Sequence, residues 1–200
     1  EARTTRYNYD ANHNLTAITY PNGNKAVYTY DGSRRVVKVN GSNLINNPDF
    51  DNPLENGSIP GWTMETPSGA SLRLDEDSFS GQKAVKLSKP AETESPLRIC
   101  SSRINTKENS DYLLSFYGKT AGINGESGLQ GVLLKGYGAN DQEIFTKQVR
   151  VDSHDWSRYS IACSSENARY IIIYGLLDRD VSGEMWLDCF QLEEQTGIDV

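Results

Sequence analysis

Apolar and polar residues alternate in short runs along most of this chain of 200 residues. A period of two is typical of β-strands that bury one face and expose the other. After residue 43 no segment combines a sustained 3.6-residue period with helix caps. The runs predict strands at Ala70–Leu74, Lys83–Leu87, Leu97–Ile104, Tyr112–Lys119, Gly131–Gly138, Ile144–Val151, Ser157–Cys163, Tyr170–Leu177 and Met185–Leu192.

Turn-forming residues separate these runs, as in Ser80-Gly81-Gln82. Many short strands at this spacing indicate an all-β, two-sheet sandwich. Within Tyr112–Lys119 the even-numbered apolar residues share one face, and the other carries the polar–aromatic row Ser115, Tyr117 and Lys119, which is expected to face solvent or a groove. On the last strand the same alternation places on one face Trp186, Asp188, Phe190 and Leu192.

The first 40 residues follow a different pattern, because Tyr7-Asn8-Tyr9-Asp10 recurs as Tyr28-Thr29-Tyr30-Asp31 with a period of 21 residues. Fixed self-similarity of this length marks a stack of small supersecondary units. Alternating runs at Leu15–Tyr20 and Ala26–Tyr30 flank Pro21-Asn22-Gly23-Asn24, and Asn-Gly between such runs predicts a β-hairpin.

This segment resembles the YD repeats of the RHS family of large bacterial surface and toxin-shell proteins. We therefore interpret residues 1–40 as two degenerate YD repeats, since the position that commonly holds Gly carries His13 in one unit and Arg34 in the other. Two such units are too few to bury a core of their own. The resemblance implies docking onto further YD repeats, a longer parent chain, and a secreted or cell-surface location in a bacterium.

Charge and composition exclude several partners. The net charge of −7 and pI near 4.9 leave no basic patch for nucleic acid. No apolar run approaches the roughly 20 residues of a membrane helix, so no membrane insertion is expected. Cys100, Cys163 and Cys189 lack CxxC spacing, which disfavours a zinc site, and their odd number predicts an unpaired thiol unless one bonds another chain.

A second resemblance covers about three-quarters of the chain. It rests on Asn43-Leu44-Ile45-x-Asn47-Pro48-x-Phe50-Asp51, Gly61-Trp62, Ser80-Gly81, Tyr112-x-Leu114-Ser115-Phe116 and Trp186-Leu187-Asp188-x-Phe190-x-Leu192-Glu193. These motifs resemble the galactose-binding-like jelly roll of carbohydrate-binding modules appended to xylanases and glucanases. We assign residues 41–194 to such a module and residues 195–200 to a linker.

The opening motif, Asn43–Asp51, is expected to be the first strand of the sandwich, with Leu44 and Phe50 as anchors. In an extended chain Asp49 and Asp51 point to one side, and the first and last strands of a jelly roll commonly lie close together. Asp188 would then meet Asp51, and two such carboxylates repel unless a cation joins them.

The resemblance implies a structural Ca²⁺ held by an acid after the Phe, by the Ser-Gly loop and by an acid of the last strand. Those positions match Asp51, Ser80 and Asp188, with Asp49 as a further carboxylate. The alternative is that Asp51 and Asp188 pair with Lys or with backbone N–H groups.

A sugar groove is the other candidate site, because aromatic faces and planar polar groups bind saccharides. The candidates on or beside the central strands are Tyr117, Lys119, Tyr137, Trp156 and Tyr174. Each aromatic residue could instead belong to the core, and Trp62 is as consistent with a core position as with a ligand platform.

The sequence gives little support for a catalytic function. His13 lies in a repeat turn and His154 in a predicted surface turn, and no nucleophile-elbow motif is present. The acidic run Asp75–Asp77 is a solvated turn rather than a pair of facing carboxylates. The sequence therefore indicates a non-catalytic module that binds polysaccharide or cell-wall glycan, and the alternative is a structural spacer that caps or interrupts the repeat array.

Overall fold

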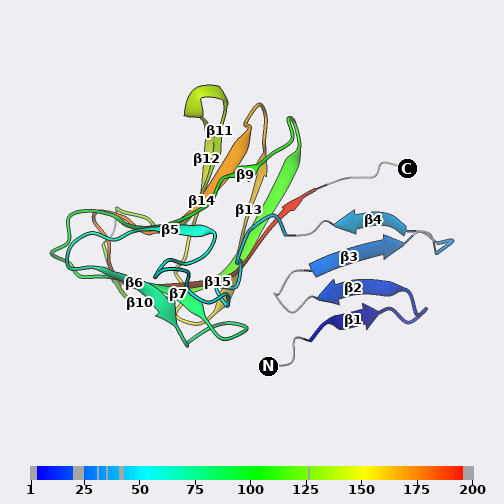
Figure 1. The fold of residues 1–200 in the computed structure, drawn as a ribbon, viewed down its shortest axis with the longest axis horizontal. Helices are drawn as coiled ribbons and strands as arrows, with labels where there is room; N and C mark the ends of the chain where they lie inside the picture. Colours follow the sequence, from blue (N-terminus) through cyan, green and yellow to red (C-terminus); the bar gives the residue numbers. More distant parts are fainter. Residues whose placement is uncertain are drawn as a thin grey trace.

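The computed structural model describes residues 4–19, 25–30, 32–34, 36–40, 43–125 and 127–195. A four-stranded antiparallel sheet, which we call the hairpin sheet, lies beside a two-layered sandwich (Figure 1). The hairpin sheet has the order β1-β2-β3-β4 and consists of β1 (Arg6–Tyr9), β2 (Leu15–Thr19), β3 (Lys25–Tyr30) and β4 (Val36–Asn40).

The turn between β1 and β2 holds His13 in a backbone conformation that favours Gly. The carboxylate of Asp10 accepts the backbone N–H groups of Asn12 and Asn14 at 2.8 and 2.9 Å. His13 has φ 63° and Arg34, at the matching place of the second unit, has φ 61°. Both lie in the left-handed region that favours Gly. The predicted turn at 21–24 lies outside the described residues.

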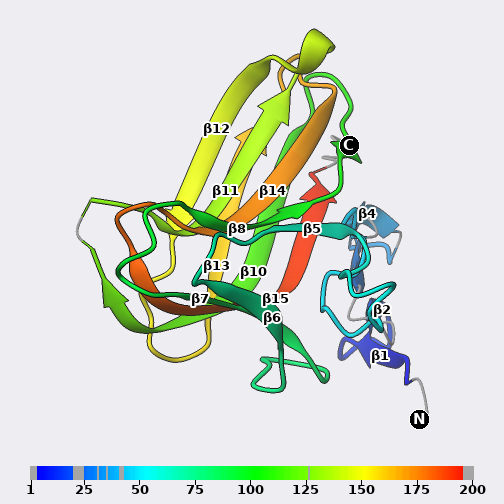
Figure 2. The ribbon, with the colours of Figure 1, turned by 60° about the vertical axis from the view of Figure 1, so that its left-hand side comes forward.

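The sandwich contains two antiparallel sheets that face each other (Figure 2). The five-stranded sheet has the order β13-β10-β15-β7-β6, with bounds Ser157–Ser164, Asp111–Asn124, Ser182–Glu194, Ala84–Lys89 and Ser71–Asp75. The six-stranded sheet has the order β12-β11-β14-β8-β5, with bounds Glu143–Arg150, Gln130–Tyr137, Tyr170–Leu177, Leu97–Ser101 and Trp62–Glu65. The short strand β9 (Ile104–Asn105) also pairs with β14, and a 3-10 turn at Ala139–Asp141 joins β11 to β12.

The predicted all-β sandwich is confirmed. The predicted run at 97–104 is divided into β8 and β9, and β5 was not predicted from the alternation.

The predicted first strand at 43–51 is wrong. Asn47 and Phe50 have φ angles of 49° and 55°, which an extended strand cannot hold. The segment still follows β15, because Leu44 N–H donates to the carbonyl of Leu192 and Phe190 N–H donates to that of Pro48. Phe50 is fully buried as expected, whereas Leu44 is 40 % exposed and is not an anchor.

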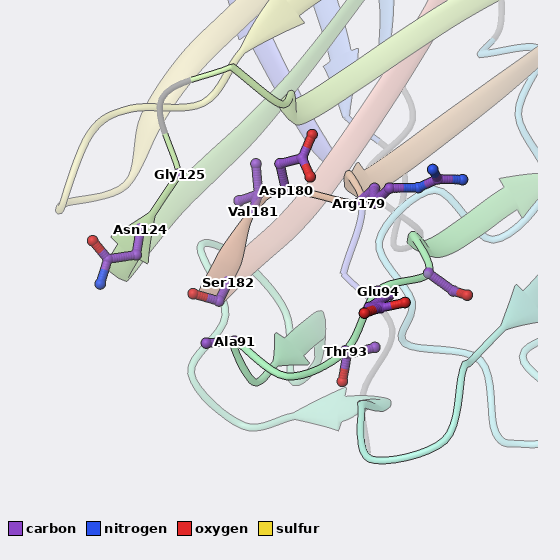
Figure 3. A pocket seen from close by; sticks show the side chains of 10 residues that line it. Ala91, Thr93, Glu94, Asn124, Gly125, Arg179, Asp180, Val181 and Ser182 are labelled. Atoms are coloured by element: carbon purple, nitrogen blue, oxygen red, sulfur yellow. The ribbon is translucent and has the colours of Figure 1, made fainter.

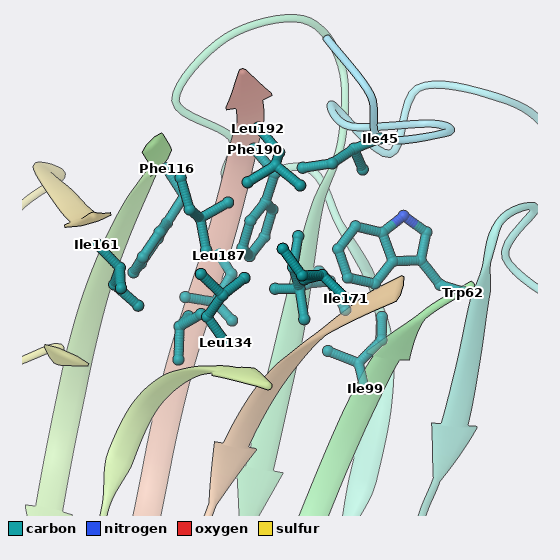
Figure 4. Close-up of a cluster of buried hydrophobic side chains, with 14 of the residues drawn as sticks. Ile45, Trp62, Ile99, Phe116, Leu134, Ile161, Ile171, Leu187, Phe190 and Leu192 are labelled. Carbon is teal, nitrogen blue, oxygen red and sulfur yellow. The ribbon is translucent and has the colours of Figure 1, made fainter. Parts of the chain in front are cut away.

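Buried aromatic rings fill the core beneath that segment (Figure 4). The Phe50 ring lies 5.1 Å from Trp62 and 6.0 Å from Phe190, and Phe116 stacks on Phe190 at 5.1 Å. The Trp62 indole also donates to the carbonyl of Asn47 at 3.0 Å. Trp62 is therefore a core residue that fixes the opening motif, not a ligand platform.

A β-bulge at Cys189 changes which residues of β15 share a face. Tyr117 pairs with Asp188 but Ser115 pairs with Gln191, so β15 holds one extra residue, and Cys189 has φ 51°. The predicted common face of the last strand is therefore wrong: Asp188 lies on the outer side of the sheet, and Phe190 turns into the core.

Candidate functional site

The outer face of the five-stranded sheet carries the polar–aromatic row predicted on β10. Tyr117 and Lys119 point away from the core, and Lys119 pairs in register with Trp186 of β15. Trp156 precedes β13 directly and reaches the same face, where its ring lies 5.1 Å from the Lys119 ammonium. Three of the five predicted sugar-binding residues therefore come together here.

The loop between β6 and β7 adds an aromatic ring that the sequence analysis did not select. Phe79 stacks face to face on Tyr117, with ring centroids 3.5 Å apart and planes at 9°. It also meets the Trp156 ring edge-on at 6.3 Å. Because one face of Phe79 is covered by Tyr117 while its side chain stays 42 % exposed, the ring presents apolar surface to solvent. We call Phe79, Tyr117, Trp156 and Lys119 the Phe79 patch.

Asp77 contacts two members of the Phe79 patch, Lys119 and Trp156. Lys119 forms an ion pair with Asp77, whose other carboxylate oxygen lies 3.4 Å from the Trp156 indole nitrogen. The hydrogen bond from Lys119 is the main cause that lowers the pKa of Asp77. Lys119 and Lys86 also lie over the Trp186 ring, at 5.1 and 4.3 Å from its centroid.

Two carboxylates from distant parts of the chain anchor the loop that carries Phe79. Asp188 Oδ2 accepts the N–H groups of Phe79 and Ser80 at 2.9 and 3.1 Å. Asp51 Oδ1 accepts those of Gln82 and Lys83 at 2.8 and 2.9 Å. These bonds fix the backbone on both sides of Gly81, so the orientation of the Phe79 ring is set by acids outside its own loop.

Burial raises the pKa of two of the neighbouring acids. Asp188 is fully buried, and this desolvation raises its pKa to about 7 against the lowering effect of its backbone hydrogen bonds. Asp49 is 7 % exposed, and burial followed by the charge of Asp51 raises its pKa to about 6. The pKa of the Cys189 thiol is raised by burial and then by the charges of Asp188, Asp49 and Asp51.

A groove of about 670 Å³ opens beside the Phe79 patch, between the sandwich and the hairpin sheet. Its sandwich side includes Phe79, Tyr117, Ser115 and Arg158, with Asp49 among the other lining residues. Its hairpin side includes Arg6 of β1. An aromatic surface bordered by planar polar groups is the composition expected of a saccharide site.

The predicted calcium ligands supply negative charge but do not form a complete coordination site. Neither Asp49, Asp51 nor Asp188 forms an ion pair with Lys, Arg or His within the described chain. Ser80, however, turns its N–H toward Asp188. No group of three or more His, Cys, Asp or Glu side chains within residues 4–195, gaps aside, is arranged to hold a metal ion. The geometry thus matches the alternative in which these acids accept backbone N–H groups, and Ca²⁺ stays a prediction.

The other two predicted sugar-binding residues lie on the opposite sheet. The hydroxyls of Tyr137 and Tyr174 are 2.9 Å apart on the outer face of the six-stranded sheet. Tyr137 stacks on Tyr170 at 5.2 Å, and Arg103 covers the Tyr170 ring. Burial, and then the bond to Tyr137, raises the pKa of Tyr174. The five predicted residues therefore cannot line one groove.

A larger cavity of about 830 Å³ lies at the loops before β8 and between β14 and β15 (Figure 3). It is lined by small and charged side chains such as Ala91, Glu94, Arg179 and Asp180, and no aromatic ring lines it. It contains none of the residues predicted for sugar or metal binding.

The histidine and the acidic run considered for catalysis have structural contacts. The Nδ1 atom of His154 lies 3.4 Å from the carbonyl of Thr120. Within the acidic run, Asp75 pairs with Arg73 and Asp77 with Lys119. No described contact joins His154 to a nucleophile.

Phe79 is the main functional candidate that the sequence analysis missed. It stands alone among polar residues in Asp77-Ser78-Phe79-Ser80-Gly81, where alternation gives no assignment. An isolated aromatic residue in a polar turn has no strand to carry it into the core, and that signal could have identified it.

Comparison with known proteins separates the two parts of the chain. Residues 2–25 and 9–43 match the RHS Repeat family. A search of curated protein sequences returns no match. In the described part of the chain no helix is long and apolar enough to cross a membrane.

Several solved structures that are similar to this chain are carbohydrate-binding modules. The CBM22-1 xylan-binding domain of Xyn10C from Paenibacillus barcinonensis is 15 % identical with a TM-score of 0.51, and the match covers 73 % of this chain and 90 % of that one. A family 16 carbohydrate-binding module is 18 % identical with a TM-score of 0.56, covering 75 % and 99 %. TmCBM61, solved with β-1,4-galactotriose, is 16 % identical with a TM-score of 0.52, covering 78 % and 100 %. These similarities confirm the jelly-roll fold.

Proposed function

We propose that this chain is a non-catalytic carbohydrate-binding module of a secreted or cell-surface RHS-repeat protein, and that the Phe79 patch receives the sugar. The observation that carries the proposal is the exposed Phe79 ring, stacked on Tyr117 beside the groove. The structural similarity to carbohydrate-binding modules supports it.

The chemistry of the patch suits a saccharide. The apolar C–H face of a pyranose packs on an aromatic ring, and its hydroxyls require planar or charged hydrogen-bonding groups at the ring edge. Tyr117 supports Phe79 from behind, so the platform is ordered before a ligand arrives, which lowers the entropic cost of binding. Trp156 stands at an angle of 63° to Phe79 and would contact the side of the same sugar.

Affinity gel electrophoresis of residues 1–200 against xylan, β-1,4-galactan, β-glucan, polygalacturonate and bacterial cell-wall glycans tests this proposal. Phe79→Ala and Trp156→Ala are expected to weaken binding at least about tenfold, within the cost of removing a central aromatic contact. Tyr9→Ala is the matched control, because Tyr9 is 60 % exposed on the hairpin sheet. Binding that survives both patch variants but is lost on Tyr174→Ala would place the sugar on the opposite sheet.

We propose separately that a structural Ca²⁺ binds beside Asp49, Asp51 and Asp188. Asp49 and Asp188 are buried, and none of the three acids forms an ion pair with a cationic side chain of the described chain. Both oxygens of Asp188 already accept backbone N–H groups, so the ion would use Oδ2 of Asp49 and Oδ2 of Asp51, together with loop carbonyls. Elemental analysis of undialysed protein is expected to give about one Ca²⁺ per chain. Substoichiometric calcium, together with an unchanged melting temperature on adding Ca²⁺, would contradict it.

A structural spacer is the second candidate function. Tyr7 and Tyr9 of β1 are 55 % and 60 % exposed, and β1 is the outer strand of the hairpin sheet. A further YD repeat that paired with this edge would cover the tyrosines. Absence of binding across the glycan panel would favour this function over the first.

A further inference from the structure

The groove beside the Phe79 patch has walls from both parts of the chain. Arg6 and Asn8 of β1 line it, and so does Thr19, which pairs with Arg6 in register. Tyr7 and Tyr9 alternate with these residues along β1, so they lie on its other face, and neither tyrosine lines the groove. One face of the first repeat is therefore turned toward the Phe79 patch.

The charges that line the groove differ in accessibility. Its two carboxylates, Asp49 and Glu193, are only 7 % and 9 % exposed. Its two guanidinium-bearing residues, Arg6 and Arg158, are both exposed. The charge available at the surface of the groove is therefore positive, although the whole chain carries −7. At physiological salt the screening length is about 8 Å, so a bound group responds mainly to the nearest charges.

Both guanidinium groups retain free donors. Arg6 makes no side-chain hydrogen bond or ion pair with another residue of the described chain. Arg158 donates one hydrogen bond, at 3.1 Å to the Ser115 hydroxyl, and forms no ion pair among those residues. Most N–H donors of both guanidinium groups therefore remain available, and a planar guanidinium group can bind a carboxylate in bidentate geometry.

We propose that the groove binds a saccharide that carries a carboxylate, such as a uronic acid unit, with Arg6 of the repeat and Arg158 of the sandwich binding the acid beside the Phe79 platform. This inference rests on the proposed carbohydrate-binding function and narrows its ligand class. It also gives the first repeat a role in recognition, because Arg6 is one of the two exposed cations of the groove.

Titration calorimetry of residues 1–200 with oligogalacturonate and with an uncharged β-1,4-galactan oligomer of equal length tests the proposal. Wild-type protein is expected to prefer the uronate at least about tenfold, the factor that one charge-assisted bidentate contact supplies. Arg6→Gln and Arg158→Gln should each remove most of that preference, and raising the salt concentration should reduce it. Arg73→Gln is the matched control, since Arg73 is 61 % exposed, pairs with Asp75 and lies outside the groove.

The outcomes separate this inference from the function on which it rests. Neutral oligomers bound as well as uronates, or uronate affinity unchanged in Arg6→Gln, would refute the acidic ligand while leaving a Phe79-dependent sugar site intact. Loss of all saccharide binding in wild-type protein would refute both proposals. Circular dichroism and the melting temperature of each variant show whether a loss of affinity comes from unfolding.

Discussion

The buried acids beneath the Phe79 loop predict an unusual dependence of stability on pH. Asp188 has a pKa of about 7 in the folded chain against 3.8 for the free side chain. The folded state therefore binds a proton that the unfolded state has already released between about pH 4 and pH 7. Stability from this residue is fully present near pH 4 and falls as pH rises toward 7.

The magnitude follows from the size of the shift. A change from 3.8 to about 7 is roughly three pKa units, and at 1.36 kcal/mol per unit it corresponds to about 4 kcal/mol. Asp49, with a pKa of about 6, changes stability in the same direction by about 3 kcal/mol.

Asp188→Asn isolates this effect because Asn has the same shape and no charge. The amide keeps one oxygen for the N–H groups of Phe79 and Ser80 but turns a donor toward Cys189, which costs about 1–3 kcal/mol at every pH. The variant is therefore expected to be less stable than wild type at pH 4 and to match or exceed it at pH 7.5.

Urea unfolding of both proteins at half-unit steps from pH 4 to pH 8, with a chelator present, measures this crossover. A stability difference that stays constant across the range would refute the raised pKa of Asp188. A difference that widens with pH would show that the ionised carboxylate is favoured in the fold. Repeating the pH 7.5 measurement with Ca²⁺ in place of chelator adds a direct test of the cation proposal, because bound Ca²⁺ would restore the relative stability of wild type.

Two further predictions concern backbone positions. Gly81→Ala places a Cβ atom 2.2 Å from Asp51 Oδ2 at φ +78° and should lower the free energy of unfolding in urea by about 2–4 kcal/mol. Gly57→Ala is the control, because Gly57 has φ +79° with nothing within 4 Å, and it should cost only about 1–2 kcal/mol. Equal losses in the two variants would mean that the Asp51 contact is unimportant. His13→Gly removes the backbone strain of a non-Gly residue at φ 63° and should stabilise the hairpin sheet by about 0.5–1 kcal/mol. The expected measurement is slower amide hydrogen exchange in β1 and β2. Faster exchange would contradict the strain argument.

The alternation of side chains was sufficient to predict most strands of the sandwich and the faces of β10. Those features depend on the period of two within a single segment, which the sequence displays directly. The repeat was equally visible, and the shared left-handed φ of His13 and Arg34 explains why these positions commonly hold Gly. The sequence alone thus determined an all-β chain with two unlike parts.

Positions that break the alternation could not be predicted in this way. The extra residue at Cys189 moved Phe190 into the core, and left-handed residues turned the opening motif into a series of turns rather than a strand. A bulge depends on the register between two strands, and no property of one strand alone reveals it.

The candidate site was decided almost wholly by tertiary structure. Tyr117 and Tyr174 carry similar local patterns, yet they lie on opposite sheets because strand order, not strand sequence, assigns a strand to a layer. The loop that carries Phe79 to Tyr117 is anchored by Asp188, 109 residues away, which accepts the Phe79 N–H group. Arg6 joins the same groove through the packing of a separate sheet. The sequence determined which side chains could bind a sugar or an ion, and long-range pairing determined which of them meet, since contacts between distant segments are not encoded in any local period.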